Sequence, residues 1–213
     1  MEGKKNKWLI VAMLFLSIFY VVGIIGLLND ATSKLFQQLT PFNILLSVVV
    51  LFCFHHPWNR SAVLSMLAVA IAGFTIEMFG VHSGKIFGSY EYGDSLGWKI
   101  SNTPLIIGLN WLLLVYITNL AMKQIGIGKP WIELTAAALM TALDYLIEPV
   151  AVQYDFWHWK EEIIPIQNFV AWFYISFIMQ LSFNRAKPVK ENKMAIPLVL
   201  LQILFFIALN IWK

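Results

Sequence analysis

The sequence predicts an all-α, polytopic membrane helix bundle with about seven transmembrane helices, and two observations carry this prediction. Hydrophobic residues make up 59% of the 213 residues, charged residues make up only 13%, and the mean hydropathy is +0.71. This composition is typical of chains that fold in lipid. Apolar stretches also recur at a length near 20 residues, which crosses a bilayer as a helix. We therefore expect one membrane-embedded domain over residues 1–213, with the motif-bearing part at about residues 73–180.

The apolar stretches differ in how clearly they are marked. The first follows a basic N-terminal flank and has no small-residue cleavage site before Asn29, so we interpret it as an uncleaved anchor. The second is the weakest, because its continuous apolar core begins only at Pro41. The expected spans are Trp8–Leu28, Leu35–Phe54, Ser61–Gly80, Pro104–Met122, Trp131–Val152, Pro165–Asn184 and Met194–Trp212.

The distribution of positive charge predicts the orientation. With the N-terminus in the cytoplasm, the inner segments hold ten of the fifteen Lys and Arg residues. Cytoplasmic loops of membrane proteins carry such an excess, so the sequence favours an N-in, C-out topology. The topology accounts for the net charge of +3, and no basic amphipathic run is present. We therefore expect no nucleic-acid partner.

Three carboxyl groups, those of Glu77, Asp144 and Glu148, lie within or at the ends of these spans. An ionisable group in hydrocarbon costs about 2.5 kcal/mol or more, so it indicates a functional site. None of the three has a Lys or Arg close by on its own helix. A carboxyl buried without a cation favours its protonated form, which suits acid chemistry on an apolar substrate.

The predicted topology places the intramembrane polar groups at a similar depth, near the outer side. Glu77 lies near the outer end of the third span, and Asn110 and Asn168 lie in the outer halves of the fourth and sixth. Asp144 and Glu148 are four residues apart, so they share one helical face at an axial separation of about 6 Å. The alternative is that these groups only bond to one another and hold the helices together, as polar residues in membrane helices often do.

Two long outer loops, at residues 80–104 and 152–165, are rich in aromatic side chains. An interfacial aromatic belt is one explanation. It does not account for their concentration on one side, above the carboxyl-bearing helices, where aromatic faces stabilise a cation. The residues expected to bind substrate are Asn110, Asn168, Tyr90, Tyr92, Trp111, Trp157, Trp159 and Trp172.

Several classes of membrane protein lack support. A retinal protein needs a lysine in its last helix, and residues 194–212 contain none. Di-iron oxygenases need many helix-spaced histidines, whereas this chain has four. The single cysteine excludes a disulfide within the chain and a Cys-based metal site. We expect neither a metal nor a cofactor, and no nucleotide-binding motif is present.

The motifs together resemble a known family. They cover the third to sixth spans and their outer loops, somewhat over half of the chain, and include Phe79-Gly80-Val81, Phe87-Gly88, Leu96-Gly97 and Glu148-Pro149, with Glu77, Tyr90, Tyr92, Trp111, Asp144, Trp157, Trp159, Asn168 and Trp172. This pattern is similar to the integral-membrane carotenoid 1,2-hydratases of the carotenoid biosynthesis protein family, such as gamma-carotene and bisanhydrobacterioruberin hydratases. One departure is Glu148, where the family favours Asp before the proline.

The resemblance implies a reaction without a redox cofactor, in which water adds across the terminal double bond of an acyclic carotenoid end to give a tertiary alcohol. It also implies a carotenoid in the bilayer as substrate, neighbouring carotenoid-pathway enzymes as partners, and the cytoplasmic membrane of a prokaryote as location. Catalysis would fall to Asp144, Glu77 and Glu148. We expect Asp144 to donate the proton, and Glu77 to position the water or share its proton.

Two other functions remain open from the sequence. A carotenoid cyclase shares the protonation step but ends its reaction by ring closure. A proton-coupled transporter would use the carboxyls as a relay; such folds often contain inverted repeats. No convincing internal repeat is present here, which makes the transporter the weaker alternative.

Overall fold

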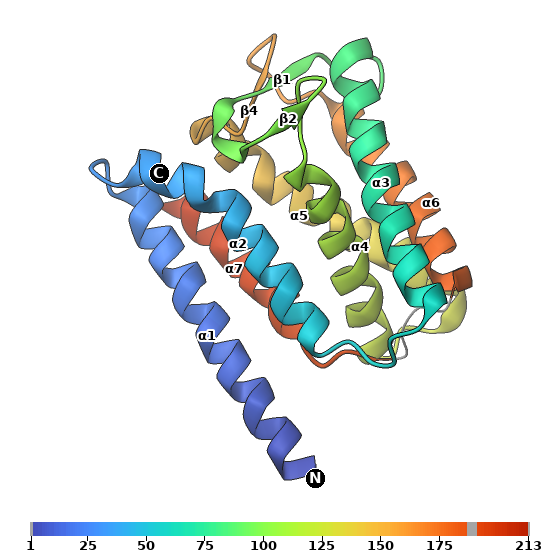
Figure 1. Cartoon of the computed structure of the whole chain (residues 1–213). Helices are drawn as coiled ribbons and strands as arrows, with labels where there is room; N and C mark the ends of the chain where they lie inside the picture. The colour runs from blue at the N-terminus through green and yellow to red at the C-terminus, as the bar shows by residue number, and fades with distance from the viewer. Residues whose placement is uncertain (1, 187–190, 213) are drawn as a thin grey trace.

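A computed structural model of the chain describes residues 2–186 and 191–212. Its described part contains seven α-helices that stand side by side, which confirms the predicted helix bundle (Figure 1). The helices are α1 (Glu2–Leu28), α2 (Ser33–Cys53), α3 (Arg60–Ser83), α4 (Ile106–Gln124), α5 (Ile132–Gln153), α6 (Ile166–Ala186) and α7 (Ala195–Ile211). The first six are long and apolar enough to cross a membrane, and α7 is shorter.

Helix α2 begins earlier than its apolar core indicates. The polar residues ahead of Pro41 are part of the helix, and some of their side chains bond within it. Gln37 donates to the Ser33 hydroxyl at 3.3 Å, and the Thr40 hydroxyl donates to the carbonyl of Phe36 at 3.1 Å. Polar side chains satisfied in this way can be accommodated in a membrane helix.

Helix α4 is the centre of the bundle. Most of its length is buried, and it packs against α2, α3, α5, α6 and α7. Helix α1 is the opposite case, since most of its length is unburied and it contacts only α2 and α7 extensively. The bundle therefore has a packed half, formed by α3 to α6, and a second half, formed by α1, α2 and α7, which we call the looser half because few residues of α1 and α2 are buried (Figure 1).

The two long loops meet at one end of the bundle, where they form short strands. Strand β1 (Tyr90–Tyr92) pairs antiparallel with β4 (Trp157–Trp159), so that Tyr90 lies opposite Trp159 and Tyr92 opposite Trp157. A second pair, β2 (Lys99–Ile100) with β3 (Thr103–Pro104), follows a 3-10 turn at Asp94–Leu96. A further 3-10 turn, Lys129–Trp131, precedes α5 at the opposite end.

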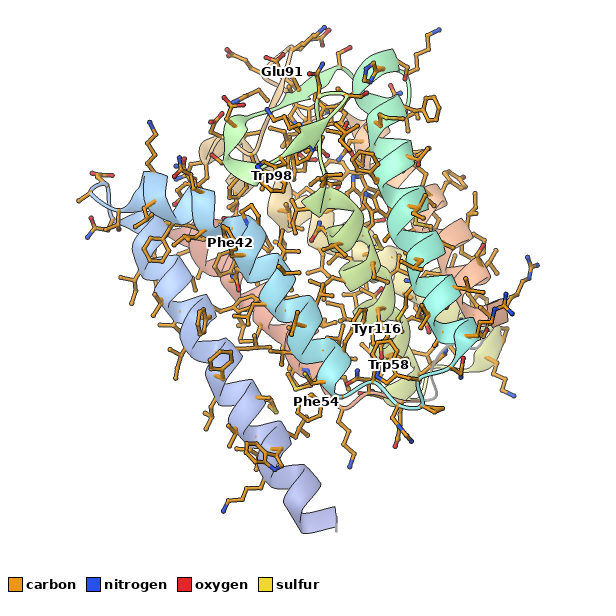
Figure 2. All side chains as sticks on the ribbon, in the orientation of Figure 1. Phe42, Phe54, Trp58, Glu91, Trp98 and Tyr116 are labelled. Carbon is orange, nitrogen blue, oxygen red and sulfur yellow. The ribbon has the colours of Figure 1, made fainter. Side chains whose placement is uncertain are left out.

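The β1–β4 pair, which we call the cover, has two faces. Successive side chains of a strand point to opposite sides. The tyrosines of β1 and the tryptophans of β4 point toward the helices, whereas Glu91 and its partner His158 are exposed. Figure 2 shows Glu91 at the outer edge of the molecule. The β1–β4 pair thus closes one end of the bundle with aromatic rings.

Candidate active site

A close crossing of α3 and α4 sets the position of Glu77. Gly73 lies one turn before Glu77, and a side chain at Gly73 would overlap Trp111 of α4. Gly108 on α4 also allows the close approach, because a Cβ there would lie 2.7 Å from the carbonyl oxygen of Ala70 on α3. Because neither glycine has a side chain, the two helices approach closely and the indole of Trp111 reaches Glu77. Nε1 of Trp111 donates to Oε1 of Glu77 at 2.9 Å.

Two tyrosines of β1 complete the surroundings of Glu77. The hydroxyls of Tyr90 and Tyr92 both donate to Oε2 of Glu77, at 2.5 and 2.8 Å. Burial, followed by the nearby Glu77 carboxyl, raises the pKa of both phenols. Both hydroxyls therefore keep their protons and act as donors, so Glu77 receives three hydrogen bonds.

Glu148 has an equivalent environment built from the other loop. Trp157 and Trp159 of β4 donate their indole N–H groups to Oε2, at 3.0 and 2.8 Å. Nδ2 of Asn168 on α6 donates to Oε1 at 3.0 Å. An indole can only donate, so Glu148 accepts both of these bonds.

Asp144 lies one helical turn before Glu148, deeper in the bundle. Nδ2 of Asn168 donates to its Oδ2 at 2.9 Å and so bridges the two carboxyls. The other oxygen, Oδ1, is buried and has no hydrogen-bond partner among the described residues.

All three carboxyls are buried without a cation. Glu77 is 4% exposed, Asp144 1% and Glu148 2%. The ion pairs among the described residues, Lys99 with Asp94 and His158 with Asp155, both lie in the loops. A buried charge is normally paired with an opposite charge. Three buried carboxyls without a cation are therefore an unusual feature of this site.

A cavity of about 30 Å³ lies between the carboxyl-bearing helices and the β1–β4 cover. One water molecule needs a cavity volume of about 10–15 Å³, so this cavity has room for water. The indole rings of Trp111 and Trp172 stack at its wall, with 4.2 Å between centroids and 10° between planes. The lining residues are Glu77, Phe87, Tyr90, Tyr92, Ile107, Asn110, Trp111, Glu148, Trp157, Trp159, Asn168 and Trp172.

The structure brings the predicted site residues together with one difference. Glu77, Glu148 and all eight residues expected to bind substrate line the cavity. Asp144 does not line it and reaches it only through Asn168. Sequence reasoning missed Ile107, although it precedes Asn110 and Trp111 at the spacing of one helical face.

The site can therefore combine three chemical functions. Carboxyl groups can transfer a proton, polar side chains can orient a water, and aromatic faces can stabilise a cation. These are the requirements of acid chemistry at an apolar double bond.

Comparison with known proteins gives the family. A family model described as carotenoid biosynthesis protein matches residues 39–212, most of the chain. The chain belongs to the carotenoid biosynthesis protein family. Membership of this family and six long apolar helices indicate a multi-pass membrane protein.

A curated relative carries a more specific name. The bisanhydrobacterioruberin hydratase of Haloarcula japonica is 25% identical over 139 residues, an alignment that covers 59% of this chain and 46% of the relative. The chain thus aligns with about half of that relative's length. No solved structure matches this carotenoid biosynthesis protein significantly.

Proposed function

We propose that this chain is a carotenoid hydratase, which adds water across the terminal double bond of an acyclic carotenoid end to give a tertiary alcohol. One observation carries the proposal: two buried carboxyls without a cation face a small cavity that is lined largely by aromatic side chains. The family and the name of the curated relative support it.

The reaction begins with a proton. A carboxyl gives its proton to the less substituted carbon of the double bond, which forms a C–H bond and leaves a tertiary cation on the other carbon. A water oxygen then bonds to that carbon, and the surplus proton of the water passes to a carboxylate. The carboxyl set ends as it began, so the reaction needs no redox cofactor.

The geometry favours a division of labour among the acids. Asp144 and Glu148 are joined by one Asn168 amide, and two carboxyls so placed hold one shared proton more readily than two negative charges. Glu148 borders the cavity, so it passes this shared proton to the substrate. Glu77 lines the same cavity, so it orients the water, accepts its proton and returns that proton to the Asp144–Glu148 pair before the next turnover.

Pigment analysis tests the proposal. Expressed in a host that accumulates lycopene, the chain is expected to yield products heavier by one or two waters. A product of unchanged mass with an altered absorption spectrum would indicate a cyclase instead, because ring closure uses the same protonation step. Unchanged lycopene beside folded protein would contradict both activities.

The source of oxygen separates hydration from oxidative hydroxylation. In membranes treated with a chelator and kept free of dioxygen, the reaction is expected to proceed, with label from isotopic water in the product. Label from isotopic dioxygen would overturn the proposal.

We further propose that the site faces outward across the cytoplasmic membrane of a prokaryote, with the N-terminus inside. The described Lys and Arg residues lie at the two ends of the bundle in the unequal partition expected from the charge count. A reporter fused at the C-terminus is expected to behave as exported, and one between α6 and α7 as cytoplasmic. The reverse result would place the site on the inner side.

A further inference from the structure

Three spaces follow one another from the membrane face of the looser half to the acids. The site cavity shares Ile107, Asn110 and Trp157 with a second cavity of about 80 Å³. That cavity in turn shares Thr40, Asn43 and Phe205 with a groove of about 420 Å³. Shared lining residues place neighbouring spaces next to each other, so the three spaces lie in series between the groove and the acids.

The outermost space, which we call the α1–α2–α7 groove, is apolar. It lies between the three helices of the looser half, and Phe42 in the middle of α2 marks it in Figure 2. Its volume falls in the range of small-molecule sites, roughly 300–1,000 Å³. The lining residues are Phe19, Val22, Gly23, Leu27, Phe36, Leu39, Thr40, Phe42, Asn43, Leu46 and Phe205, none of them charged.

The groove opens toward lipid rather than water. Several side chains of its wall, such as those of Phe19, Val22 and Phe42, are exposed on the bundle surface. These positions lie within membrane spans, so their exposed faces contact acyl chains. A hydrophobic molecule dissolved in the bilayer can therefore reach the groove without crossing water.

The middle cavity has more polar groups beside it than the groove has. Tyr20, Ser47 and Gln202 are linked beside it by hydrogen bonds of 3.2 Å. Oδ1 of Asn43 is buried there without a partner among the described residues, so it can accept a hydrogen bond from a molecule in the passage. The series thus runs from an apolar groove, past a free acceptor, to the acids.

We propose that this series is the substrate channel, in which the α1–α2–α7 groove holds the polyene arm of an acyclic isoprenoid while its end reaches Glu77 and Glu148. The proposal rests on the proposed function for its ligand. The decrease in cavity volume from about 420 to about 80 and then to about 30 Å³ fits it, because the innermost space has room for the end of a chain but not for its long arm. The free acceptor of Asn43 suits the new hydroxyl as the product withdraws.

Photo-crosslinking tests the channel without using catalysis. Benzoylphenylalanine is placed at position 42, which lines the groove, or at position 45, which is exposed on the same helix but does not line it. In membranes containing lycopene, we expect an adduct with the mass of protein plus lycopene at position 42, and little at position 45. Equal adducts at both positions, or none at position 42, would overturn the channel.

Matched substitutions add a kinetic test. Val22 and Val21 are 47% and 53% exposed, and Leu39 and Leu45 are 40% and 43% exposed, yet only Val22 and Leu39 line the groove. We expect Val22→Trp and Leu39→Trp to lower lycopene hydration roughly tenfold by filling the groove. A short acyclic hydrocarbon with the same terminal double bond needs no groove, so its hydration should persist. Val21→Trp and Leu45→Trp should preserve both rates.

The outcomes separate the two proposals. A selective adduct at position 42 in a protein that hydrates nothing would support the channel and contradict the hydratase. Normal lycopene hydration in both groove-filling variants would overturn the channel while the hydratase stands.

Discussion

Two of the buried polar clusters beside α4 are built differently. The first is the acid cluster of Glu77, Asp144 and Glu148 at the loop end. The second lies further along the helix, where Gln180 of α6 donates to the Thr118 hydroxyl at 2.9 Å and Asn119 donates to Gln180 at 2.7 Å. The second cluster contains only neutral groups, each acting as partner to another.

The difference indicates that buried polar residues in this bundle have more than one role. The cluster of Thr118, Asn119 and Gln180 is typical of side chains that hold membrane helices together. The acid cluster instead takes most of its hydrogen-bond donors from aromatic residues of both loops and borders a cavity. Helix association explains the first arrangement better than the second.

Replacing the acids should have the largest effect on activity. Glu148→Gln and Glu77→Gln keep size but remove proton transfer, so we expect lycopene hydration to fall by about 10²- to 10⁴-fold. The amount of protein in the membrane should stay near that of the unaltered chain, as immunoblotting of membranes would show. Loss of the protein together with its activity would indicate a structural role instead.

Gly73→Ala should have a moderate effect. The added methyl overlaps Trp111, and overpacking of this kind costs about 1–3 kcal/mol. Displacement of the indole weakens its bond to Glu77, so we expect hydration to fall roughly tenfold. Gly128→Ala is the control, because a Cβ there meets nothing closer than 3.9 Å. Full activity in Gly73→Ala would show that the Trp111 contact is dispensable.

Gln180→Leu should affect stability rather than activity. It leaves the buried amide of Asn119 without its acceptor, so the free energy of unfolding should fall by about 1–3 kcal/mol. Unfolding in a detergent titration measures this, and hydration per folded molecule should remain within about twofold. A large loss of activity at unchanged stability would contradict the distinction between the clusters.

The smallest effect is expected from Glu91→Gln, which makes the same chemical change as Glu77→Gln at an exposed position of β1. Surface substitutions of this kind usually change little. Pigment analysis and thermal unfolding should match those of the unaltered chain. A clear loss of hydration would show that charge on the cover, and not only in the cavity, supports the reaction.

Hydropathy predicted the helices well because each span must be apolar along about 20 residues, whatever its neighbours are. The same constraint identified Glu77, Asp144 and Glu148, since a carboxyl is conspicuous in an apolar stretch. The order of the acids around the cavity was less predictable. Whether Asp144 or Glu148 borders the cavity depends on the rotation of α5 against α6, and spacing along one helix does not determine this rotation.

The pairing of the two loops was also beyond the sequence prediction. Strands of three residues are too short for alternation to stand out, although Tyr90-Glu91-Tyr92 and Trp157-His158-Trp159 both alternate aromatic and polar residues. Gly73 went unrecognised because a glycine in a membrane helix gives no sign of which residue on another helix will occupy its space.

The β1–β4 pair has a consequence for a molecule with two reactive ends. In the proposed channel this pair covers the end beside the acids, so we expect a long chain that enters from the lipid to leave by the same route. Its other end can react only after the molecule has been released, has turned over in the bilayer and has been captured again. We therefore expect the two ends to be processed in separate encounters, with the singly modified pigment free in the membrane between them.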